Sequence, residues 1–469
     1  MNQPVASQFL RREFPPALLD ELKAILGQER VSVAHAVREH HGKDESSFPY
    51  ALPDAVVFPE TTEEVSRIVK ACAKHKFPVI PYGTGTSLEG HILAIHGGVS
   101  VDVSRMNNVL EIHAADLDAV VQAGVTRKQL NAFIKDTGLF FPVDPGADAS
   151  IGGMSATRAS GTAAVRYGTM KENVMALTVV MADGRIVKTG RRTKKSSAGY
   201  DLTRLFVGSE GTLGIITEVT VKLYPQPEAL SAAVCCFPTM VAAADTVIQA
   251  IQLGVPVARC DFVDPLCVKA INQFSKLSLK EVPTVFFEFH GSASGVKEQA
   301  ELVQQIASEH GAENFQWATK PEERSKLWQA RHDAYFACLQ LQAGSRIVST
   351  DVCVPISRLA ECLAETEKDI QASGRLVPVL GHIGDGNFHL CIVVNPDSDA
   401  DLHVAEEMNH RLVQRAIAME GTCTGEHGIG YGKMEFLREE HGDAVDVMRM
   451  VKQALDPDNI MNPGKVVAS

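Results

Sequence analysis

The stretch Pro81-Tyr82-Gly83-Thr84-Gly85-Thr86-Ser87 decides the fold of this chain, and it follows an apolar run, residues 77–80, that is typical of a buried strand. Its two glycines allow positive φ and a tight turn. Consecutive backbone N–H groups in such a turn form a concavity that binds anions, and the three hydroxyl side chains add further donors. The loop therefore suits a pyrophosphate held by neutral donors, although an ordinary glycine turn remains the alternative for this loop alone.

Two familiar phosphate-binding motifs do not fit this loop. A P-loop carries a lysine directly after its last glycine, and this loop has Thr86 there. A dinucleotide GxGxxG fingerprint needs a third glycine at the position of Leu88. The pyrophosphate interpretation therefore rests on neither motif.

Two more glycine-rich stretches lie downstream. The second stretch is Pro145-Gly146-Ala147-Asp148-Ala149-Ser150-Ile151-Gly152-Gly153, which has almost no bulky side chains and leads on to Ser160-Gly161. The third is Gly208-Ser209-Glu210-Gly211-Thr212-Leu213-Gly214-Ile215. Three such loops beside strand-like segments imply a backbone that packs closely against one long ligand.

In their order and spacing, the three loops resemble the FAD-binding domain of the vanillyl-alcohol-oxidase and MurB-like flavoenzymes, the PCMH type. The resemblance covers roughly residues 47–225. It implies that the first loop wraps the FAD pyrophosphate and that the later loops line the flavin and its ribityl chain. It also implies that a residue of the C-terminal tail lies near the isoalloxazine. The implied cofactor contacts are Pro81, Gly83, Thr84, Gly85, Thr86, Ser87, Pro145, Gly146, Ser150, Gly152, Gly153, Ser160, Gly161, Glu210, Gly211, Gly214, Ile215 and Asn462.

The bulk composition is that of an ordinary soluble globular protein, with 45% hydrophobic and 22% charged residues in 469. A net charge of −12 argues against a nucleic-acid-binding surface. No apolar run reaches the roughly 18 residues of a membrane span, and residues 1–16 lack the apolar core of a signal peptide. The ten cysteines form no CxxC pair, which predicts reduced thiols and a cytoplasmic location, with peripheral attachment at the inner membrane as an alternative.

Alternating apolar segments predict an α+β fold with an antiparallel sheet in its second domain. In the first domain, strands are expected at 55–58, 99–102, 119–123, 175–181 and 214–223, and residues 35–53 are expected to be irregular. Thr61 or Thr62 and Thr126 are expected helix caps. The expected domains are an N-terminal helical segment (1–46), a two-lobed FAD-binding domain (47–225), a substrate- and metal-binding cap domain (226–443), and a C-terminal helix and tail (444–469) returning to the FAD domain.

The sequence Gly381-His382-Ile383-Gly384-Asp385-Gly386-Asn387-Phe388-His389 carries the main catalytic signal of the cap domain. Asp-Gly is a favoured two-residue hairpin turn, and that turn would place His382 directly opposite His389. Opposed residues have Cβ atoms about 4.5–5.5 Å apart, and two imidazoles at that distance suit a divalent metal. A structural role for both histidines is the alternative.

A second motif, Thr424-Gly425-Glu426-His427-Gly428-Ile429-Gly430, encloses a glutamate and a histidine between glycines. A solvated charged turn is the plain interpretation. Together, however, the two motifs resemble the C-terminal domain of FAD-linked 2-hydroxy-acid dehydrogenases. This resemblance spans almost the whole chain, and it implies that His382, His389 and Glu426 hold the metal and that His427 is the catalytic base.

The expected anchor for a substrate carboxylate is Arg331, in Leu327-Trp328-Gln329-Ala330-Arg331, which matches the family's Trp-x-x-Arg. A guanidinium binds a carboxylate with two parallel hydrogen bonds. The stretch 349–355 is most similar to the D-lactate branch, because the hydroxyglutarate branch tends to carry a lysine just before Asp351. Arg346 lies nearby in the sequence, so a dicarboxylate substrate stays open.

The sequence therefore predicts FAD-dependent oxidation of a D-2-hydroxy acid, with D-lactate favoured and pyruvate as its product. Hydride would pass to flavin N5, assisted by a divalent metal, Zn²⁺ or Mn²⁺, and a histidine base. The electron acceptor would be cytochrome c, a quinone or an electron-transfer flavoprotein, and a homodimer is one expected assembly. The open alternatives are a D-2-hydroxyglutarate or glycolate dehydrogenase, a non-redox FAD protein of the same fold, and a metal hydrolase whose loops bind a nucleotide.

Overall fold

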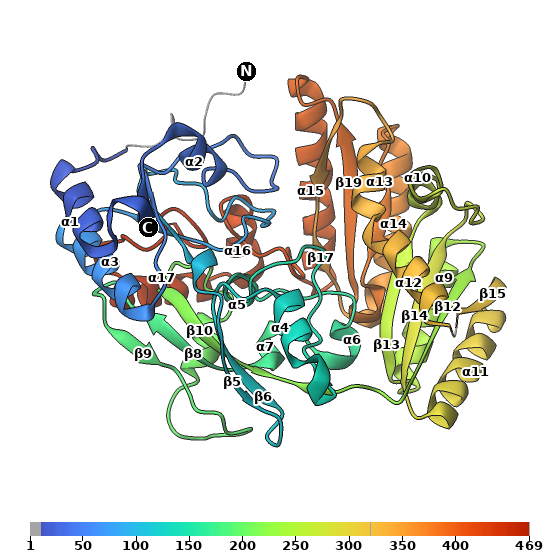
Figure 1. Ribbon diagram of the computed structural model, residues 1–469. Coiled ribbons are helices and arrows are strands. Elements are labelled where there is room, and N and C mark those ends of the chain that lie inside the picture. The colour runs from blue at the N-terminus through green and yellow to red at the C-terminus, as the bar shows by residue number, and fades with distance from the viewer. Residues whose placement is uncertain (1–10, 319, 469) are drawn as a thin grey trace. The chain divides into compact units, whose positions relative to one another are not determined.

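The computed structural model describes residues 11–318 and 320–468, and the chain divides into two compact units (Figure 1). Unit 1 comprises Met1–Ser160, Gly168–Gln226 and Glu426–Ser469. Unit 2 comprises Gly161–Tyr167 and Pro227–Gly425. The chain thus enters unit 2 twice, briefly at Gly161–Tyr167 and again after Gln226, and it returns to unit 1 for the last time at Glu426.

Unit 1 begins with a four-stranded sheet in the order β1-β2-β4-β3, in which β2, β4 and β3 run parallel. Its strands are β1 (Val31–Ser32), β2 (Ala55–Val57), β3 (Val79–Tyr82) and β4 (Val99–Asp102). Helix α3 (Thr62–Lys74) connects β2 to β3, and the Thr61 side chain caps it by accepting a hydrogen bond from the N–H of Glu64. Helix α1 (Pro16–Leu26) packs its buried leucines into the same core.

The second sheet of unit 1 is antiparallel, in the order β5-β6-β10-β8-β9. Its strands are β5 (Val109–His113), β6 (Asp118–Gln122), β8 (Val174–Val180), β9 (Ile186–Lys188) and β10 (Ile215–Lys222). Helix α4 (Arg127–Ile134) starts at the expected cap, Thr126, in a capping box with Gln129. Helix α5 (Ile151–Thr157) contributes Ile151 and Met154 to the core of this sheet.

Shorter elements complete unit 1. They are α2 (His35–His40), α7 (Met170–Asn173), α8 (Leu202–Phe206), α16 (Met434–His441), α17 (Ala444–Leu455) and the strand pair β7 (Leu139–Phe140) with β11 (Tyr224–Pro225). The expectation of an irregular segment at 35–53 was wrong for α2, whose short polar sequence has no apolar periodicity to announce it. The C-terminal tail lies against β3, because Val79 N–H donates to Ile460 O and Asn462 N–H donates to Val79 O, both at 2.8 Å.

Unit 2 is built on an antiparallel sheet in the order β15-β12-β14-β13-β18-β19-β16, with β17 also paired to β19. Figure 1 shows the green and yellow strands of this sheet beside the orange β19, which comes from a distant part of the chain. The strands are β12 (Ala229–Cys236), β13 (Val257–Val263), β14 (Thr284–Gly291), β15 (Glu313–Ala318), β16 (Arg346–Ser349), β17 (Val352–Cys353), β18 (Val379–Gly381) and β19 (Asn387–Val394). The helices are α6 (Ala164–Tyr167), α9 (Met240–Gln252), α10 (Pro265–Ser275), α11 (Ala293–Glu309), α12 (Pro321–His332), α13 (Ala334–Leu339), α14 (Leu359–Ser373) and α15 (Asp399–Ala418).

The expected two-residue hairpin at Asp385-Gly386 was wrong in its register. Leu380 of β18 pairs with His389 of β19, so His382 lies beyond the end of β18 and is not directly opposite His389. The connection is instead a turn of 3-10 helix, Ile383–Asp385, closed by Gly386 at φ 80°. Ile383 is fully buried there, and that packing favours the longer loop. His382 is therefore outside the strand pairing, and its position is set by the loop rather than by the register of the sheet.

Two short segments fall in a different unit from the domain expected for them. Residues 426–443 belong to unit 1 rather than to the cap domain, since the N–H groups of Ile429 and Gly430 donate to the Glu210 carboxylate. Residues 161–167 belong to unit 2, where Tyr167 Oη lies 2.7 Å from His290 Nδ1. Both assignments depend on contacts between residues far apart in the sequence.

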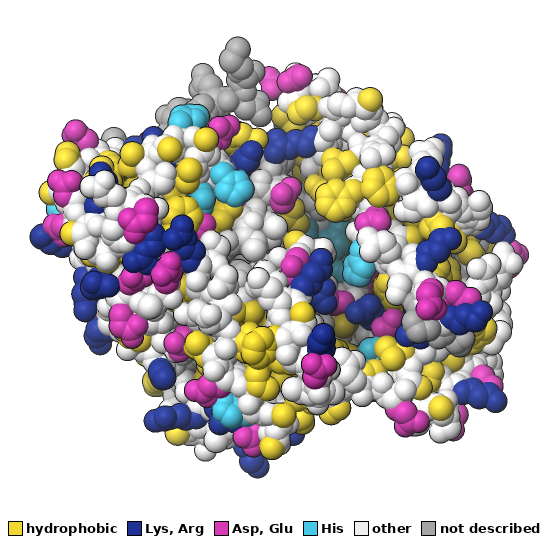
Figure 2. All heavy atoms as spheres, in the orientation of Figure 1, with side chains coloured by type: hydrophobic (Ala, Val, Ile, Leu, Met, Phe, Trp, Pro, Cys, Tyr) yellow, Lys and Arg dark blue, Asp and Glu magenta, His cyan; other side chains and the backbone are white. Residues whose placement is uncertain are grey.

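The surface has mixed charge. On the face shown in Figure 2, acidic and basic side chains are interspersed rather than gathered by sign. Among the described residues, no helix combines the length and apolar character needed to cross a bilayer.

Candidate active site

The three glycine-rich stretches of unit 1 lie against one another. A Cβ added to Gly83 would come within 2.6 Å of Ser150 Oγ, so the first and second stretches are in contact. A Cβ on Gly211 would lie 2.8 Å from Pro81 Cγ, so the third stretch also packs on the first. The three loops quoted from the sequence therefore form one cradle at the end of β3.

The first loop offers backbone donors to a ligand. Within the described part of the chain, the N–H groups of residues 84–87 donate to no other group of the protein. Gly85 has φ +70°, and a Cβ there would lie 2.5 Å from Tyr82 Oη. The Ser87 hydroxyl donates to Asp44 at 3.0 Å, so it is less available to a phosphate than expected. Backbone N–H groups that make no hydrogen bond within the protein, in a glycine turn, are typical of an anion-binding site.

The other end of the cradle is charged and buried. Glu210, at positive φ, accepts hydrogen bonds from the N–H groups of Ile429 and Gly430 at 2.8 and 2.7 Å. His91 Nε2 lies 3.2 Å from Glu210 Oε2. The Asn462 side-chain amide donates to the carbonyl oxygens of His91 and Glu210. The tail residue that the sequence placed near the flavin thus lies against the third glycine stretch.

Three buried polar atoms in this region have no hydrogen-bond partner among the described residues. They are His91 Nδ1, Ser209 Oγ and Asn462 Oδ1. Burying an unsatisfied polar group costs about 1–3 kcal/mol, so several together indicate a polar ligand. The unpartnered atoms and the undonated amides of the first loop therefore fit a group such as FAD, which carries a pyrophosphate at one end and a heteroaromatic ring at the other.

In unit 2, the two predicted metal-binding histidines lie side by side. The rings of His382 and His389 have centroids 5.9 Å apart and planes at 81°. His389 Nδ1 donates to the Thr350 carbonyl at 3.0 Å, and His382 Nδ1 donates to the Asp261 carboxylate at 2.8 Å. These bonds fix in each ring the tautomer whose lone pair is on Nε2, which is the arrangement that metal-binding histidines use.

Asp261 connects the histidine pair to the predicted substrate anchor. Its Oδ1 contacts His382, and its Oδ2 lies 2.9 Å from Nε of Arg331. Burial alone would raise the pKa of this fully buried carboxyl, but Arg331 and His382 together bring the pKa below its usual value. Arg331 is itself buried, with 6% of its surface exposed. One ionised carboxylate therefore orients both groups.

A second carboxylate, Asp351, binds the last residues of unit 2, just before Glu426. It lies 3.5 Å from His389 Nδ1 and accepts hydrogen bonds from Asn387 Nδ2 and Thr424 Oγ1, both at 2.7 Å. A Cβ on Gly425 would collide with the Asn387 amide. The residue directly before Glu426 is thus packed on the strand that carries His389, within unit 2.

Glu426 and His427 are the first residues of the returning segment and belong to unit 1. His427 Nδ1 lies 3.8 Å from Glu89 Oε1, and Lys433 Nζ lies 3.3 Å from the same oxygen. All three side chains are more than 90% buried. The sequence motif therefore places a buried imidazole beside a buried carboxylate.

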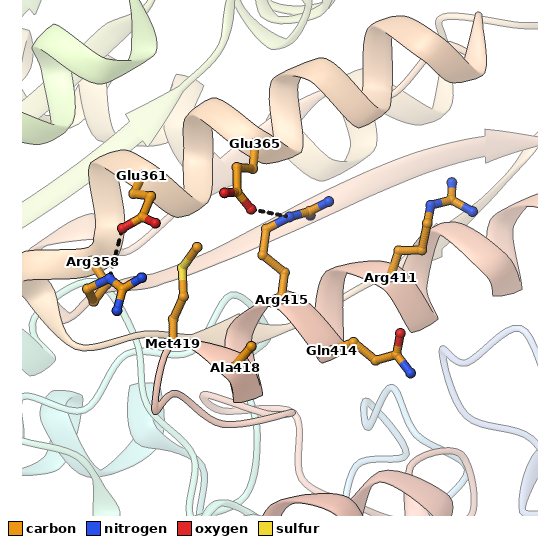
Figure 3. Close-up of a pocket in the computed structure, with 8 residues that line it drawn as sticks. All are labelled: Arg358, Glu361, Glu365, Arg411, Gln414, Arg415, Ala418 and Met419. Atoms are coloured by element: carbon orange, nitrogen blue, oxygen red, sulfur yellow. Dashed lines mark hydrogen bonds and ion pairs between the residues drawn. The ribbon is translucent and has the colours of Figure 1, made fainter.

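Unit 2 also has an open surface pocket of ≈ 480 Å³ between α14 and α15 (Figure 3). It is lined by Arg358, Glu361, Glu365, Arg411, Gln414, Arg415, Ala418 and Met419. Arg358 pairs with Glu361 at 2.9 Å and Arg415 with Glu365 at 3.3 Å. None of the predicted site residues lines this pocket, and the remaining lining arginine, Arg411, pairs with Asp369 at 3.0 Å.

Sequence reasoning missed the groups that orient the site. Asp261, Asp351, Asn387 and His91 were not singled out for a role. The available signal was weak: Asp261 is an acid inside the apolar strand Val-Ala-Arg-Cys-Asp-Phe-Val, where a charge is rarely buried without a partner. The predicted residue Gly161 lies in the segment of unit 2, and Pro145 and Gly146 lie on a loop where Gly146 has open space around it.

Two family models match the chain. The model described as "FAD linked oxidases, C-terminal domain" matches residues 226–466, and the model described as "FAD binding domain" matches residues 53–190. The first model alone covers more than half of the chain and includes His382, His389, Glu426 and His427.

Named proteins match over nearly the full length. The chain is 51% identical over 454 residues to "Probable D-lactate dehydrogenase, mitochondrial" of Danio rerio, covering 96% of this chain and 91% of that protein. It is 47% identical over 459 residues to "D-lactate dehydrogenase [cytochrome], mitochondrial" of Arabidopsis thaliana, covering 97% and 81%. Among solved structures, p-cresol methylhydroxylase with substrate bound has a TM-score of 0.80 at 17% identity, covering 98% of both chains, which shows a shared fold.

Proposed function

Because this chain belongs to the FAD-linked oxidase family, we propose that it oxidises a D-2-hydroxy acid, with D-lactate as the substrate and pyruvate as the product. The relatives named D-lactate dehydrogenase support this substrate. The observation that carries the proposal is the Asp261 carboxylate, which contacts both Arg331 and His382. It orients a carboxylate-binding cation and a metal-binding imidazole together, as a 2-hydroxy acid requires.

Each end of the substrate has a candidate partner. Arg331 binds the carboxylate, and its guanidinium can do so with two parallel hydrogen bonds. His427 takes the proton of the 2-hydroxyl as general base, a role worth about 10²–10⁴-fold in rate. Glu89 beside Nδ1 of His427 favours the tautomer with its lone pair on Nε2.

FAD, held by the cradle of unit 1, supplies the hydride acceptor when it is bound. The first glycine loop binds its pyrophosphate, while Glu210, His91 and Asn462 form the wall at the flavin end. The remaining cofactor contacts expected from the sequence stay part of this proposal, including Gly161 at the start of unit 2.

His382, His389 and Glu426 would hold a divalent metal, which lowers the pKa of a bound hydroxyl. Two imidazoles and one carboxylate suit Zn²⁺ or Mn²⁺. Support comes from the Nδ1 hydrogen bonds of both histidines and from Gly425, which packs on Asn387 directly before Glu426. The hydrogen bonds at Nδ1 thus leave the Nε2 lone pair of each histidine available to a metal ion.

The electron acceptor is cytochrome c, a quinone or an electron-transfer flavoprotein. The Arabidopsis thaliana relative carries "cytochrome" in its name, which favours the first. The same names read "mitochondrial", so the cytoplasmic location expected from the cysteines stays a prediction, as does the homodimer. All ten cysteines lie in the part of the chain that the structure describes, and each is a free thiol there.

One experiment tests substrate and metal together. The yellow protein is assayed for D-lactate oxidation with an artificial dye acceptor, then treated with a chelator, and finally given Zn²⁺ or Mn²⁺. We expect turnover, loss of turnover without loss of FAD, and recovery with the ion. Failure to oxidise D-lactate at any stage would overturn the substrate, whereas full activity after exhaustive chelation would overturn only the metal.

A further inference from the structure

The steps proposed above for binding the substrate and moving its proton do not use a buried ion pair of unit 1. His91 and Glu210 lie 3.2 Å apart, with only 5% and 3% of their side chains exposed. Neither ring nitrogen of His91 makes a hydrogen bond within the described part of the chain, although Nε2 faces the carboxylate. A buried imidazole with an unpartnered Nδ1 indicates that something outside the protein chain completes its surroundings.

The pair is held firmly in place. Both oxygens of Glu210 accept backbone hydrogen bonds, from Ile429 and Gly430. Gly428 packs on the pair so closely that a Cβ there would lie 2.6 Å from Glu210 Oε1 and 2.8 Å from His91 Nε2. Asn462 ties the backbone carbonyls of His91 and Glu210 together. Several backbone and side-chain contacts therefore fix the positions of His91 and Glu210.

The surroundings favour the charged form of His91. Burial lowers the pKa of the imidazole, but the Glu210 carboxylate outweighs this effect and the pKa of His91 is raised overall. Asp44 and Glu89 act in the same direction. Burial would raise the pKa of Glu210, yet His91 and the two backbone N–H groups lower it. The carboxylate 3.2 Å from Nε2 thus favours the protonated form of His91.

The pair lies at the reacting end of the cradle. It contacts residues 428–430, which directly follow His427, the proposed base. It is also bonded to Asn462, whose Oδ1 is a second unpartnered buried atom. The pyrophosphate loop at residues 83–87, by contrast, contacts Ser150 and Tyr82. The pair therefore lies beside the segment that follows His427 and beside the tail residue that the sequence places near the flavin.

We propose that His91, kept cationic by Glu210, stabilises the negative charge that two-electron reduction places on the FAD ring. This inference rests on the proposed function only in taking FAD as the bound cofactor. A hydride leaves Cα of the 2-hydroxy acid and reduces FAD to FADH⁻, while the hydroxyl proton passes to His427 and a 2-oxo acid forms. The flavin thus gains one negative charge, which a fixed neighbouring cation favours.

The test compares His91→Asn, His91→Gln and His91→Lys by the midpoint potential of the bound FAD. Potentials are measured by equilibration with redox dyes, without substrate, so failure of the D-lactate assignment cannot affect them. We expect the two neutral variants to have lower potentials than wild type, because the FADH⁻ charge loses its cation. His91→Lys keeps the charge and should recover most of the potential.

His113→Asn is the matched control. His113 is also an imidazole of unit 1 paired with a buried acid, lying 2.9 Å from Asp118, but it is on β5 and its ion-pair partners, Glu111 and Asp118, are not cradle residues. Its replacement should leave the potential unchanged.

A second measurement is the rate of flavin reduction at saturating substrate. We expect it to fall by up to roughly 10²–10³-fold in the neutral variants, with little change in KM. Equal potentials for the neutral and Lys variants would overturn the proposal. So would loss of FAD from all three variants alike, which would mark His91 as a packing residue.

Discussion

Asp261 connects the imidazole and the guanidinium of the predicted site in unit 2. Its two oxygens contact His382 at 2.8 Å and Arg331 at 2.9 Å, and the side chain is fully buried. Removing one partner of a buried charge pair leaves the other charge uncompensated, which costs far more than a surface pair would. Asp261 therefore acts on the proposed site through His382 and Arg331, whose positions it fixes.

Asp261→Asn should lower kcat/KM for D-lactate by roughly 10–100-fold, the range seen when a partner of a metal-binding histidine is changed. The Asn side chain is neutral and has only one oxygen. It therefore cannot replace a carboxylate that contacts His382 with one oxygen and Arg331 with the other. Steady-state kinetics with a dye acceptor measures the loss. Asp264→Asn, also a buried aspartate just beyond the end of β13, is the control and should keep wild-type activity. Equal activity of the two variants would remove Asp261 from the site.

Gly85→Ala should weaken FAD binding. The residue has φ +70°, and a Cβ there would lie 2.5 Å from Tyr82 Oη, which would displace the loop proposed to bind the pyrophosphate. The absorbance ratio of flavin to protein after purification measures the loss. Gly138→Ala carries the same backbone strain at φ +72° with nothing within 4 Å, so it should stay fully yellow. If both variants retain FAD equally, the cradle is assigned to the wrong loop.

At the residue scale, the sequence predicted chemistry where residue type and glycine spacing coincide. His382, His389, Arg331 and Glu210 were singled out because the motifs around them are specific. Asp261 was not, because a single acid within an apolar strand acquires meaning only from the neighbours that strand pairing brings to it. His91 was missed for the same reason, since its partner Glu210 is far away in the sequence.

Among the elements, helix α10 begins at a capping aspartate, Asp264, whose carboxyl has a raised pKa. Asp264 caps it by accepting the N–H of Cys267 at 2.7 Å. Burial raises the pKa of this carboxyl to about 7, against 3.8 in the unfolded chain. The unfolded state therefore ionises first, and the free energy of unfolding falls as pH rises from about 4 to about 7. Below this window the carboxyl is protonated in both states and costs nothing.

Asp264→Asn keeps a capping side chain that cannot ionise, and Asn is as good a cap as Asp. We expect the variant to exceed wild type in Tm by more at about pH 8 than at about pH 5. Thermal melts of both proteins at the two pH values give the comparison. Asp264→Ala, which loses the cap, should be less stable than the Asn variant by about 1 kcal/mol. A constant Tm difference between Asn and wild type would show that the carboxyl does not titrate in this window.

Most elements with strong periodicity or a clear cap were predictable. Thr61 and Thr126 cap α3 and α4, and β4 has the bounds expected of it. The connection between His382 and His389 was not predictable. The Asp-Gly pair favours a two-residue turn, but the burial of Ile383 and the packing of Gly384 against Val165 favour a longer loop. Val165 lies more than two hundred positions earlier in the sequence, so no turn rule could include it.

For the whole molecule, the expected α+β architecture, a PCMH-type FAD-binding domain with a second domain on an antiparallel sheet, is confirmed by the family models and the solved relatives. The order of the glycine loops carried the resemblance for the first domain, and the alternating apolar segments predicted the second. The segment 426–443 could not be placed from sequence, since its place in unit 1 depends on Glu210 accepting hydrogen bonds from Ile429 and Gly430.

The proposed chemistry divides its parts between the two units. His382, His389 and Arg331 belong to unit 2, whereas the cradle, Glu426 and His427 belong to unit 1. The proposed reaction can be followed on the flavin itself, without any electron acceptor.

The most direct measurement is reduction of the flavin by substrate without oxygen. The yellow protein is mixed anaerobically with D-lactate, L-lactate or D-2-hydroxyglutarate, and the absorbance of oxidised flavin is followed in time. The carboxylate, the hydroxyl and the Cα hydrogen need three fixed partners, so only one enantiomer can be oxidised. We expect rapid bleaching with D-lactate, slower bleaching with D-2-hydroxyglutarate and none with L-lactate. An oxidised flavin spectrum that persists with D-lactate, or equal rates for the two lactate enantiomers, would contradict the proposed function.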